Sequence, residues 1–341
     1  MRLASWLRRP VIWLPISVGL IGLLVWRAKP WDAAGEIGAV DPAPLILAAA
    51  LSVAVAGLWA LRSADLLAGA GESISVAALV PMTAFANTIN NLTPGSAGEV
   101  VRMYLLREHH RVAFATSAAV IFVERLGALG YLTTSAVLAW ASWLGILPPA
   151  LAALVAIVLV AGPIVVYRLG LRPLAVVRAL PLGTIMGTGR WDRAKGWLSR
   201  VDDAVAGLVG RPRRLLAFVA ITALVLAIYA TQLMLVARAI GVALDPLAAW
   251  GALGVAMTVG VVSLLPFGLG TTDLALAGLL GVLGATPGQA LAITVGYRLV
   301  STLPLGLAGV LSYAWLSARL PGRSVTDAAR AIGSEVADLS R

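Results

Sequence analysis

The stretch NNLTPGSAGE, Asn90–Glu99, constrains the fold most, because it places two amides, a proline, two glycines and an acid directly after a long apolar run. A second polar break, PFGLGTTD at Pro266–Asp273, follows another apolar run in the same way. In both breaks a glycine stands four positions after the proline. Each break is followed, inside a later apolar run, by an arginine, Arg125 or Arg298. The repeated pattern indicates an internal duplication.

The composition indicates an integral membrane protein. Of the 341 residues, 60% are hydrophobic and 12% are charged, and the mean hydropathy is +0.92. A soluble domain is about a quarter charged. A membrane helix needs about 20 predominantly apolar residues, so the bilayer sets the length of the expected elements.

Eight apolar runs are candidates for membrane helices. They are Val11–Trp26, Pro44–Leu61, Ser75–Ile89, Ala113–Trp143, Leu147–Tyr167, Leu215–Ala237, Ala248–Leu265 and Ala290–Leu316. Shorter apolar pieces follow the two breaks, at Val100–Leu106 and Leu274–Leu283. The first run follows three arginines, as in a secretory signal, but lacks a small-residue cleavage pattern, so we expect an uncleaved helix.

The distribution of positive charge predicts the topology. The loop Arg168–Arg214 carries ten Lys or Arg residues and is expected in the cytoplasm, as are the arginines at both termini. This requires residues 75–107 to form a hairpin that opens to the cytoplasm and residues 248–283 to form one that opens to the opposite side. The alternative, eight plain spanning helices with an external N-terminus, leaves the terminal arginines outside.

We therefore predict an all-α polytopic membrane protein built of inverted repeats, with about six spanning helices and two re-entrant broken hairpins. The expected organisation is a single membrane domain, 1–341, made of a first half at 1–167 with hairpin 75–107, a cytoplasmic basic loop at 168–214, a second half at 215–318 with hairpin 248–283, and a cytoplasmic tail at 319–341.

The two breaks are candidates for an anion site. Half-helices that begin near Ala97 and Thr271 would present unpaired N–H groups and positive dipole ends, which suit a phosphate. The alternative is a kink that only helps helices to pack. Amides at Asn87, Asn90 and Asn91 line the approach to the first tip, or else hydrogen-bond between helices.

Arg125 and Arg298 are costly in hydrocarbon unless they are paired or face water. Their planar guanidinium groups fit phosphate well. The alternative is a structural ion pair with Glu99, Glu124 or Asp273. If these carboxylates titrate instead, they would permit proton coupling.

Several classes of chemistry are disfavoured. The chain has no cysteine, and its two histidines are adjacent, so we expect no metal site. No phosphate-binding loop and no hydrolase or zinc-protease motif is present, and we expect no cofactor. The net charge of +10 is explained by topology, so we expect no nucleic-acid partner.

The paired motifs NNLTPGSAGEVVRMYLL with VERLGAL, and LLPFGLGTTDLAL with GYRLVSTLPLGLAG, resemble the lysylphosphatidylglycerol synthase transmembrane region, also called the flippase-like or YbhN-like family. The resemblance covers about Leu61–Leu316. It implies movement of an aminoacylated phospholipid between leaflets, and no synthase activity for a chain without the aminoacyl transferase domain. The acid that closes the second motif is commonly glutamate in the family but is Asp273 here.

The residues and the resemblance together nominate one substrate-binding set. It comprises Asn90, Asn91, Pro94, Gly98, Glu99, Arg102, Glu124, Arg125, Pro266, Gly268, Gly270, Asp273 and Arg298. We expect a lipid flippase or transporter for an anionic or modified phospholipid, or for a polyprenyl-linked lipid, in a bacterial cytoplasmic (inner) membrane with both termini cytoplasmic. One alternative is a membrane-embedded headgroup transferase or hydrolase with Glu99 or Glu124 as general base. Another is a membrane partner that docks a soluble enzyme on the Arg168–Arg214 loop.

The absence of cysteine makes the predicted topology directly testable. A single cysteine introduced by Gly95→Cys should react with a membrane-impermeant thiol reagent from the cytoplasmic side, because the first hairpin is expected to open there. Labelling only from the outside would contradict this topology.

Overall fold

The computed structural model describes residues 40–92, 97–152, 154–155, 188–209, 211–263, 268 and 270–317. Its principal helices are α4 (Pro42–Gly69), α5 (Val76–Leu92), α6 (Ala97–His110), α7 (Phe114–Trp143), α11 (Thr188–Val209), α12 (Pro212–Ala239), α13 (Pro246–Val262), α14 (Thr271–Val282) and α15 (Pro287–Ser317). The predicted first helix, the site prolines Pro94 and Pro266, most of Leu147–Tyr167 and the C-terminal tail lie outside the described residues.

The predicted all-α polytopic membrane fold is confirmed. Within the described ranges there is no strand, and α4, α7, α12 and α15 are long and apolar enough to cross a bilayer. The helices between them are shorter, at 17 and 14 residues for α5 and α6 and 17 and 12 for α13 and α14. Each predicted hairpin thus contains two short helices, α5 and α6 in the first and α13 and α14 in the second.

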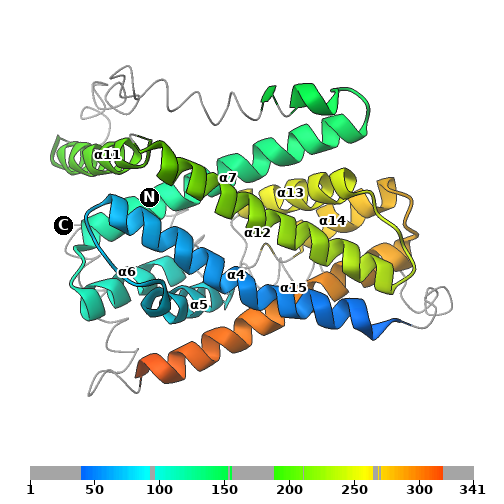
Figure 1. Ribbon diagram of the computed structural model, residues 1–341, viewed down its shortest axis with the longest axis horizontal. Helices are drawn as coiled ribbons and strands as arrows, with labels where there is room; N and C mark the ends of the chain where they lie inside the picture. Colours follow the sequence, from blue (N-terminus) through cyan, green and yellow to red (C-terminus); the bar gives the residue numbers. More distant parts are fainter. Residues whose placement is uncertain are drawn as a thin grey trace.

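The two halves run in opposite directions (Figure 1). Helices α4 and α12 are antiparallel, since the Asp41 N–H donates to the Ala239 carbonyl at one end, 3.2 Å apart, and Arg214 donates to the Asp65 carbonyl at the other, also 3.2 Å apart. Helices α5 and α6 occupy the end of the bundle where α4 finishes, and α13 and α14 occupy the opposite end (Figure 1). We call these the first end and the second end.

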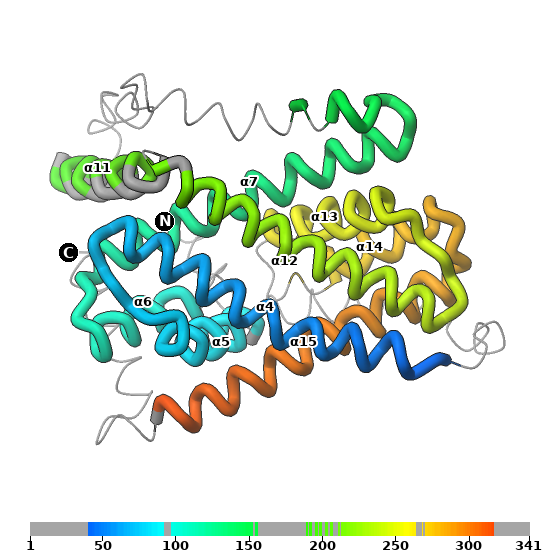
Figure 2. Tube along the Cα trace, viewed as in Figure 1, coloured from blue at the N-terminus to red at the C-terminus, as the bar shows by residue number. Residues whose placement is uncertain are grey.

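Each hairpin packs against the long helix of the other half (Figure 2). On α13, Trp250 donates to Ser135 of α7 at 3.1 Å. On α5, the Phe85 ring stacks on Tyr313 of α15, with centroids 5.3 Å apart. This exchange explains why neither half can bury its apolar faces alone.

A reciprocal pair of hydrogen bonds marks the twofold relation between α4 and α12. Arg62 donates to the Thr222 hydroxyl at 3.2 Å, and Gln232 donates to the Ser52 hydroxyl at 2.7 Å. Arg62 and Gln232 each stand nine residues before the left-handed glycine that ends their helix, Gly71 or Gly241. The register therefore makes Arg62 equivalent to Gln232, and Ser52 equivalent to Thr222.

Part of the predicted cytoplasmic basic loop is the helix α11, which packs against α7 and α12. Trp191 and Asp202 of this helix are buried. Helix α11 therefore packs on the bundle with both an apolar and a polar side chain buried.

Glycines bring the two arms of each hairpin into contact. A Cβ on Gly98 would lie 1.8 Å from the Ala86 carbonyl oxygen of α5. In the second hairpin, a Cβ on Gly260 of α13 would lie 1.9 Å from the Thr272 hydroxyl of α14. Only a residue without a Cβ permits these approaches, so the hairpins depend on them.

We expect Gly98→Ala to destabilise the protein by about 1–3 kcal/mol, because α6 must move away from the α5 backbone. Thermal unfolding of the purified protein in detergent measures this. The matched control is Gly57→Ala on α4, where an added Cβ meets nothing within 4 Å and should be neutral or stabilising by up to about 1 kcal/mol. Equal Tm values for the two variants would refute the tight contact.

Candidate functional site

The tips of both hairpins line one cavity of about 550 Å³ in the middle of the bundle. Its charged lining groups among the described residues are four arginines and three carboxylates: Arg62, Arg102, Arg125, Arg298, Glu99, Glu124 and Asp273. The lining therefore has an excess of one positive charge when all seven groups are ionised. An anion is the complementary ligand.

In the second half, the break ends in a glycine that starts α14. Gly270 has φ +82°, a conformation that glycine adopts without strain. Its N–H donates to the Asp273 carboxylate, 3.0 Å away, so the acid caps its own helix. Asp273 also accepts two hydrogen bonds from Arg298, at 2.7 and 3.2 Å. The hydrogen bond from the Gly270 N–H thereby fixes the carboxylate that orients the arginine.

In the first half, Glu99 has the equivalent place near the start of α6. It accepts a hydrogen bond from Asn90 Nδ2 at 2.9 Å and one from Arg125 Nη2. Its second oxygen lies 3.0 Å from Arg102 Nη2. Glu99 is thus held between an arginine of its own helix and one of α7.

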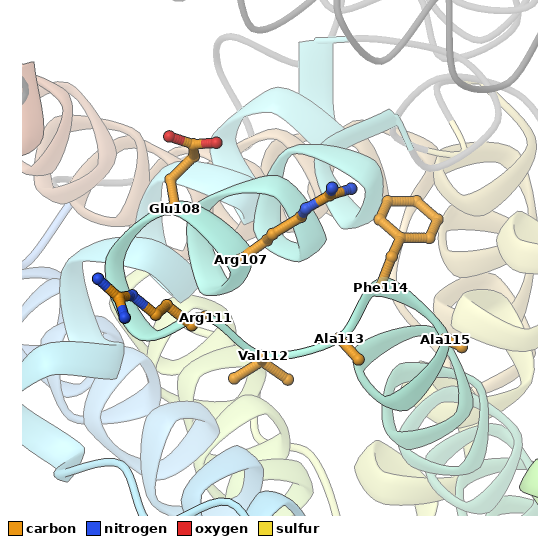
Figure 3. A pocket seen from close by; sticks show the side chains of 7 residues that line it. All are labelled: Arg107, Glu108, Arg111, Val112, Ala113, Phe114 and Ala115. Atoms are coloured by element: carbon orange, nitrogen blue, oxygen red, sulfur yellow. The ribbon is translucent and has the colours of Figure 1, made fainter.

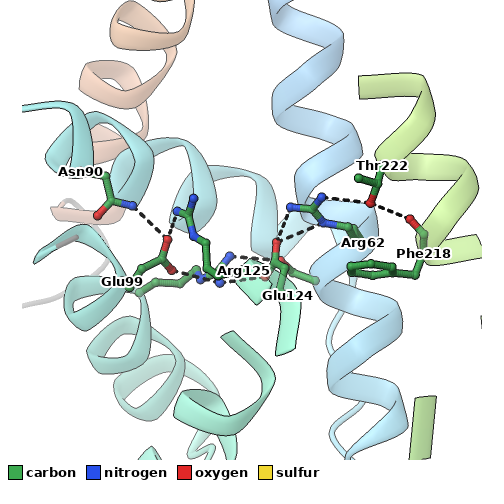
Figure 4. Close-up of polar contacts among 9 residues, drawn as sticks. Arg62, Asn90, Glu99, Glu124, Arg125, Phe218 and Thr222 are labelled. Carbon is green, nitrogen blue, oxygen red and sulfur yellow. Dashed lines mark hydrogen bonds and ion pairs between the residues drawn. The ribbon is translucent and has the colours of Figure 1, made fainter. Parts of the chain in front are cut away.

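Glu124 lies at the centre of a buried cluster of charged side chains (Figure 4). Its Oε1 accepts from Arg62 Nη2 at 3.0 Å, and its Oε2 accepts from Arg102 Nη2 at 2.8 Å and from the Ser63 hydroxyl at 3.1 Å. Thr222 continues the network by accepting from Arg62 Nη1 at 3.2 Å. Side chains of four helices, α4, α6, α7 and α12, therefore belong to one hydrogen-bond network around this carboxylate.

The arginines differ in how accessible they are to a ligand. The Arg125 side chain is 55% exposed, and that of Arg298 is 23% exposed, whereas those of Arg62 and Arg102 are 8% and 7% exposed. A guanidinium has five N–H donors. Arg125 and Arg298 can therefore approach a ligand anion, while the other two hold Glu124.

The structure brings most of the predicted set together. Asn90, Asn91, Glu99, Arg102, Glu124, Arg125, Gly268, Asp273 and Arg298 all line the cavity. Gly98 and Gly270 are not among the described lining residues; the first lies against α5, and the second donates its N–H to the Asp273 carboxylate. These two glycines therefore determine the backbone geometry of the hairpin tips and do not themselves line the cavity.

Sequence reasoning missed Arg62, Ser63 and Tyr297. Arg62 directly follows the apolar run Pro44–Leu61, and its side chain is buried on Glu124. An arginine directly after an apolar run is normally interpreted as a helix end. The available signal was that leucines continue beyond Arg62, at Leu66 and Leu67, within the same helix α4. Tyr297, next to Arg298, carried no signal beyond its neighbour.

A second cavity, of about 590 Å³, lies at the turn between α6 and α7 (Figure 3). Arg107, Glu108 and Arg111 surround it, and Arg111 has φ +57°. None of the residues nominated from the sequence lines it. It is a feature of the first end rather than of the central site.

The family model for the lysylphosphatidylglycerol synthase TM region matches residues 11–309. The chain belongs to this family. A search of curated proteins found no match.

Membership of the lysylphosphatidylglycerol synthase TM region family makes the chain an integral membrane protein and relates it to lipid chemistry. The matched family is the membrane part of synthase-like proteins rather than their catalytic part. Within the described ranges, no group of three or more His, Cys, Asp or Glu residues is arranged to hold a metal ion.

Glu124→Gln should destabilise the protein by about 3–5 kcal/mol, because it leaves two buried arginines without their shared negative partner. The readout is the Tm in detergent. The matched control is Glu108→Gln, an exposed position, where the change should stay within about 0.5 kcal/mol. An unchanged Tm for Glu124→Gln would show that the cluster does not stabilise the bundle.

Proposed function

We propose that this protein is a lipid transporter that moves a lipid with an anionic, phosphate-bearing headgroup between the leaflets of the membrane. The observation that carries the proposal is the central cavity, lined by both hairpin tips and by two accessible arginines. The membrane is proposed to be a bacterial cytoplasmic membrane, with both termini in the cytoplasm.

The hairpins support a binding site deep in the bilayer. Helices α6 and α14 have 14 and 12 residues, fewer than the about 20 that span the hydrocarbon core. We infer that both hairpins are re-entrant, so that their tips lie near the midplane. Inverted repeats with discontinuous helices at their interface are the arrangement that many secondary transporters use around a substrate.

The ion pairs at the tips provide a way to bind and release a phosphate. Each accessible arginine has its own carboxylate, Glu99 for Arg125 and Asp273 for Arg298. Phosphate oxygens compete with these carboxylates for guanidinium N–H groups, while the carboxylates keep the empty arginines paired. The carboxylates therefore lower the free-energy cost of keeping arginines in the membrane when no ligand is bound. An anion can still bind, because it replaces the carboxylate as hydrogen-bond acceptor.

The apolar part of the cavity favours a lipid over a small soluble anion. Leu126 of α7 and Val261 of α13 both line the cavity, and each is 52% exposed. In a bilayer, such exposed apolar positions contact lipid chains. The headgroup would bind inside the bundle while its acyl chains lie along the exposed Leu126 and Val261 side chains and extend into the membrane.

In proteoliposomes with fluorescent phospholipids, Arg125→Ala and Arg298→Ala should each reduce leaflet transfer at least about tenfold, because a charge-assisted contact is lost. Arg213→Ala, which removes an exposed arginine at the start of α12, is the matched control and should transfer at the parent rate. A panel of phospholipid and polyprenyl substrates identifies the headgroup class.

Transfer by both arginine variants at the parent rate would remove these residues from the mechanism. Formation of a new lipid product by the parent in detergent, where no leaflets exist, would favour the headgroup transferase or hydrolase instead.

A further inference from the structure

One polar atom of the cavity has no part in the ion pairs described above. Tyr297 lines the cavity and is only 4% exposed. Within the part of the chain that the structure describes, its hydroxyl has no partner with hydrogen-bond geometry, and the Ser301 side chain is its polar neighbour on the same helix. Buried hydroxyl groups normally have a partner, so this one is available for a ligand.

The twofold relation gives Tyr297 a counterpart in the first half, namely Glu124. Glu124 directly precedes Arg125, which pairs with Glu99 across 26 positions. Tyr297 directly precedes Arg298, which pairs with Asp273 across 25 positions. The carboxylate of the first half is thus replaced by a neutral phenol in the second.

The groups that bind Glu124 are replaced as well. In the register of α4 and α12, Arg62 and Ser63 correspond to Gln232 and Leu233. When Glu99 is aligned with Asp273, Arg102 corresponds to Leu276, because each stands three residues after its acid. Gln232 donates through Nε2 to Ala48 and Ser52. The two leucines are fully buried. The second half therefore keeps the accessible arginine but lacks the buried charged cluster beside it.

Resting on the function proposed above, we infer that Tyr297 is a specificity-determining contact, whose hydroxyl donates a hydrogen bond to a phosphate oxygen of the lipid headgroup. Arg298 supplies the adjacent positive charge. In the first half the counterpart of Tyr297 is Glu124, an internal carboxylate that accepts hydrogen bonds from arginines. In the second half Tyr297 is a donor instead, and the ligand provides the acceptor.

The chemistry of the pair selects an anion. A tyrosine hydroxyl is neutral at physiological pH and donates one hydrogen bond. Next to a guanidinium, it favours an acceptor that also carries negative charge. A phosphate has several oxygens that can accept from both side chains, whereas a neutral diacylglycerol hydroxyl provides no charge for Arg298.

The test compares Tyr297→Phe with the parent in the purified full chain, because this change removes only the hydroxyl. The probes are dioctanoyl phosphatidylglycerol and the neutral dioctanoylglycerol, and the measurements are lipid binding in detergent and the Tm without lipid. We expect binding of the phosphatidylglycerol to weaken about tenfold or more, with no loss of Tm. The matched control is Tyr313→Phe on the same helix, where the ring stacks on Phe85 outside the cavity lining.

Unchanged phosphatidylglycerol binding by Tyr297→Phe would overturn the inference while leaving the transporter proposal standing. A fall in the Tm without lipid would also overturn it, because the hydroxyl would then have a structural partner. A parent that binds the neutral lipid as well as phosphatidylglycerol would refute the phosphate site itself, and with it both proposals.

Discussion

The burial of Glu124 between Arg62 and Arg102 is the interaction on which the first half of the bundle depends. A charge removed from water is tolerated only when it is paired and its remaining hydrogen-bonding groups are satisfied. Two arginines and the Ser63 hydroxyl meet that requirement here. Because these groups come from three helices, the cluster fixes how α4, α6 and α7 lie relative to one another.

The polar breaks have a different role, which is to end helices inside the protein. Each break gives a half-length helix whose first turn carries an acid, Glu99 or Asp273. Both acids pair with an arginine on the following long helix. The same local device, used twice in opposite directions, brings two accessible arginines to one cavity.

The halves are similar in course but unequal in chemistry. The first half holds a buried cluster of charges, whereas the equivalent positions of the second half are a tyrosine, a glutamine and two leucines. Both hairpins keep a close contact between their two arms, although the glycine stands on α6 in the first hairpin, at Gly98, and on α13 in the second, at Gly260. The polar residues at the interface between the two halves are free to diverge. The first half therefore has a charged cluster beside the cavity, whereas the second half has both polar and apolar residues at the equivalent positions.

The sequence by itself determined the all-α membrane fold, since apolar runs of bilayer length leave few alternatives, and it identified the paired breaks and Arg125 and Arg298 as exceptional. It did not determine which acid each arginine meets, because Glu99, Glu124 and Asp273 were all available partners. Only the tertiary structure decided that Arg62 is buried on Glu124 and that Tyr297 has its counterpart there. Spacing along one helix specifies a face, but contacts across the bundle depend on how helices far apart in the chain pack together.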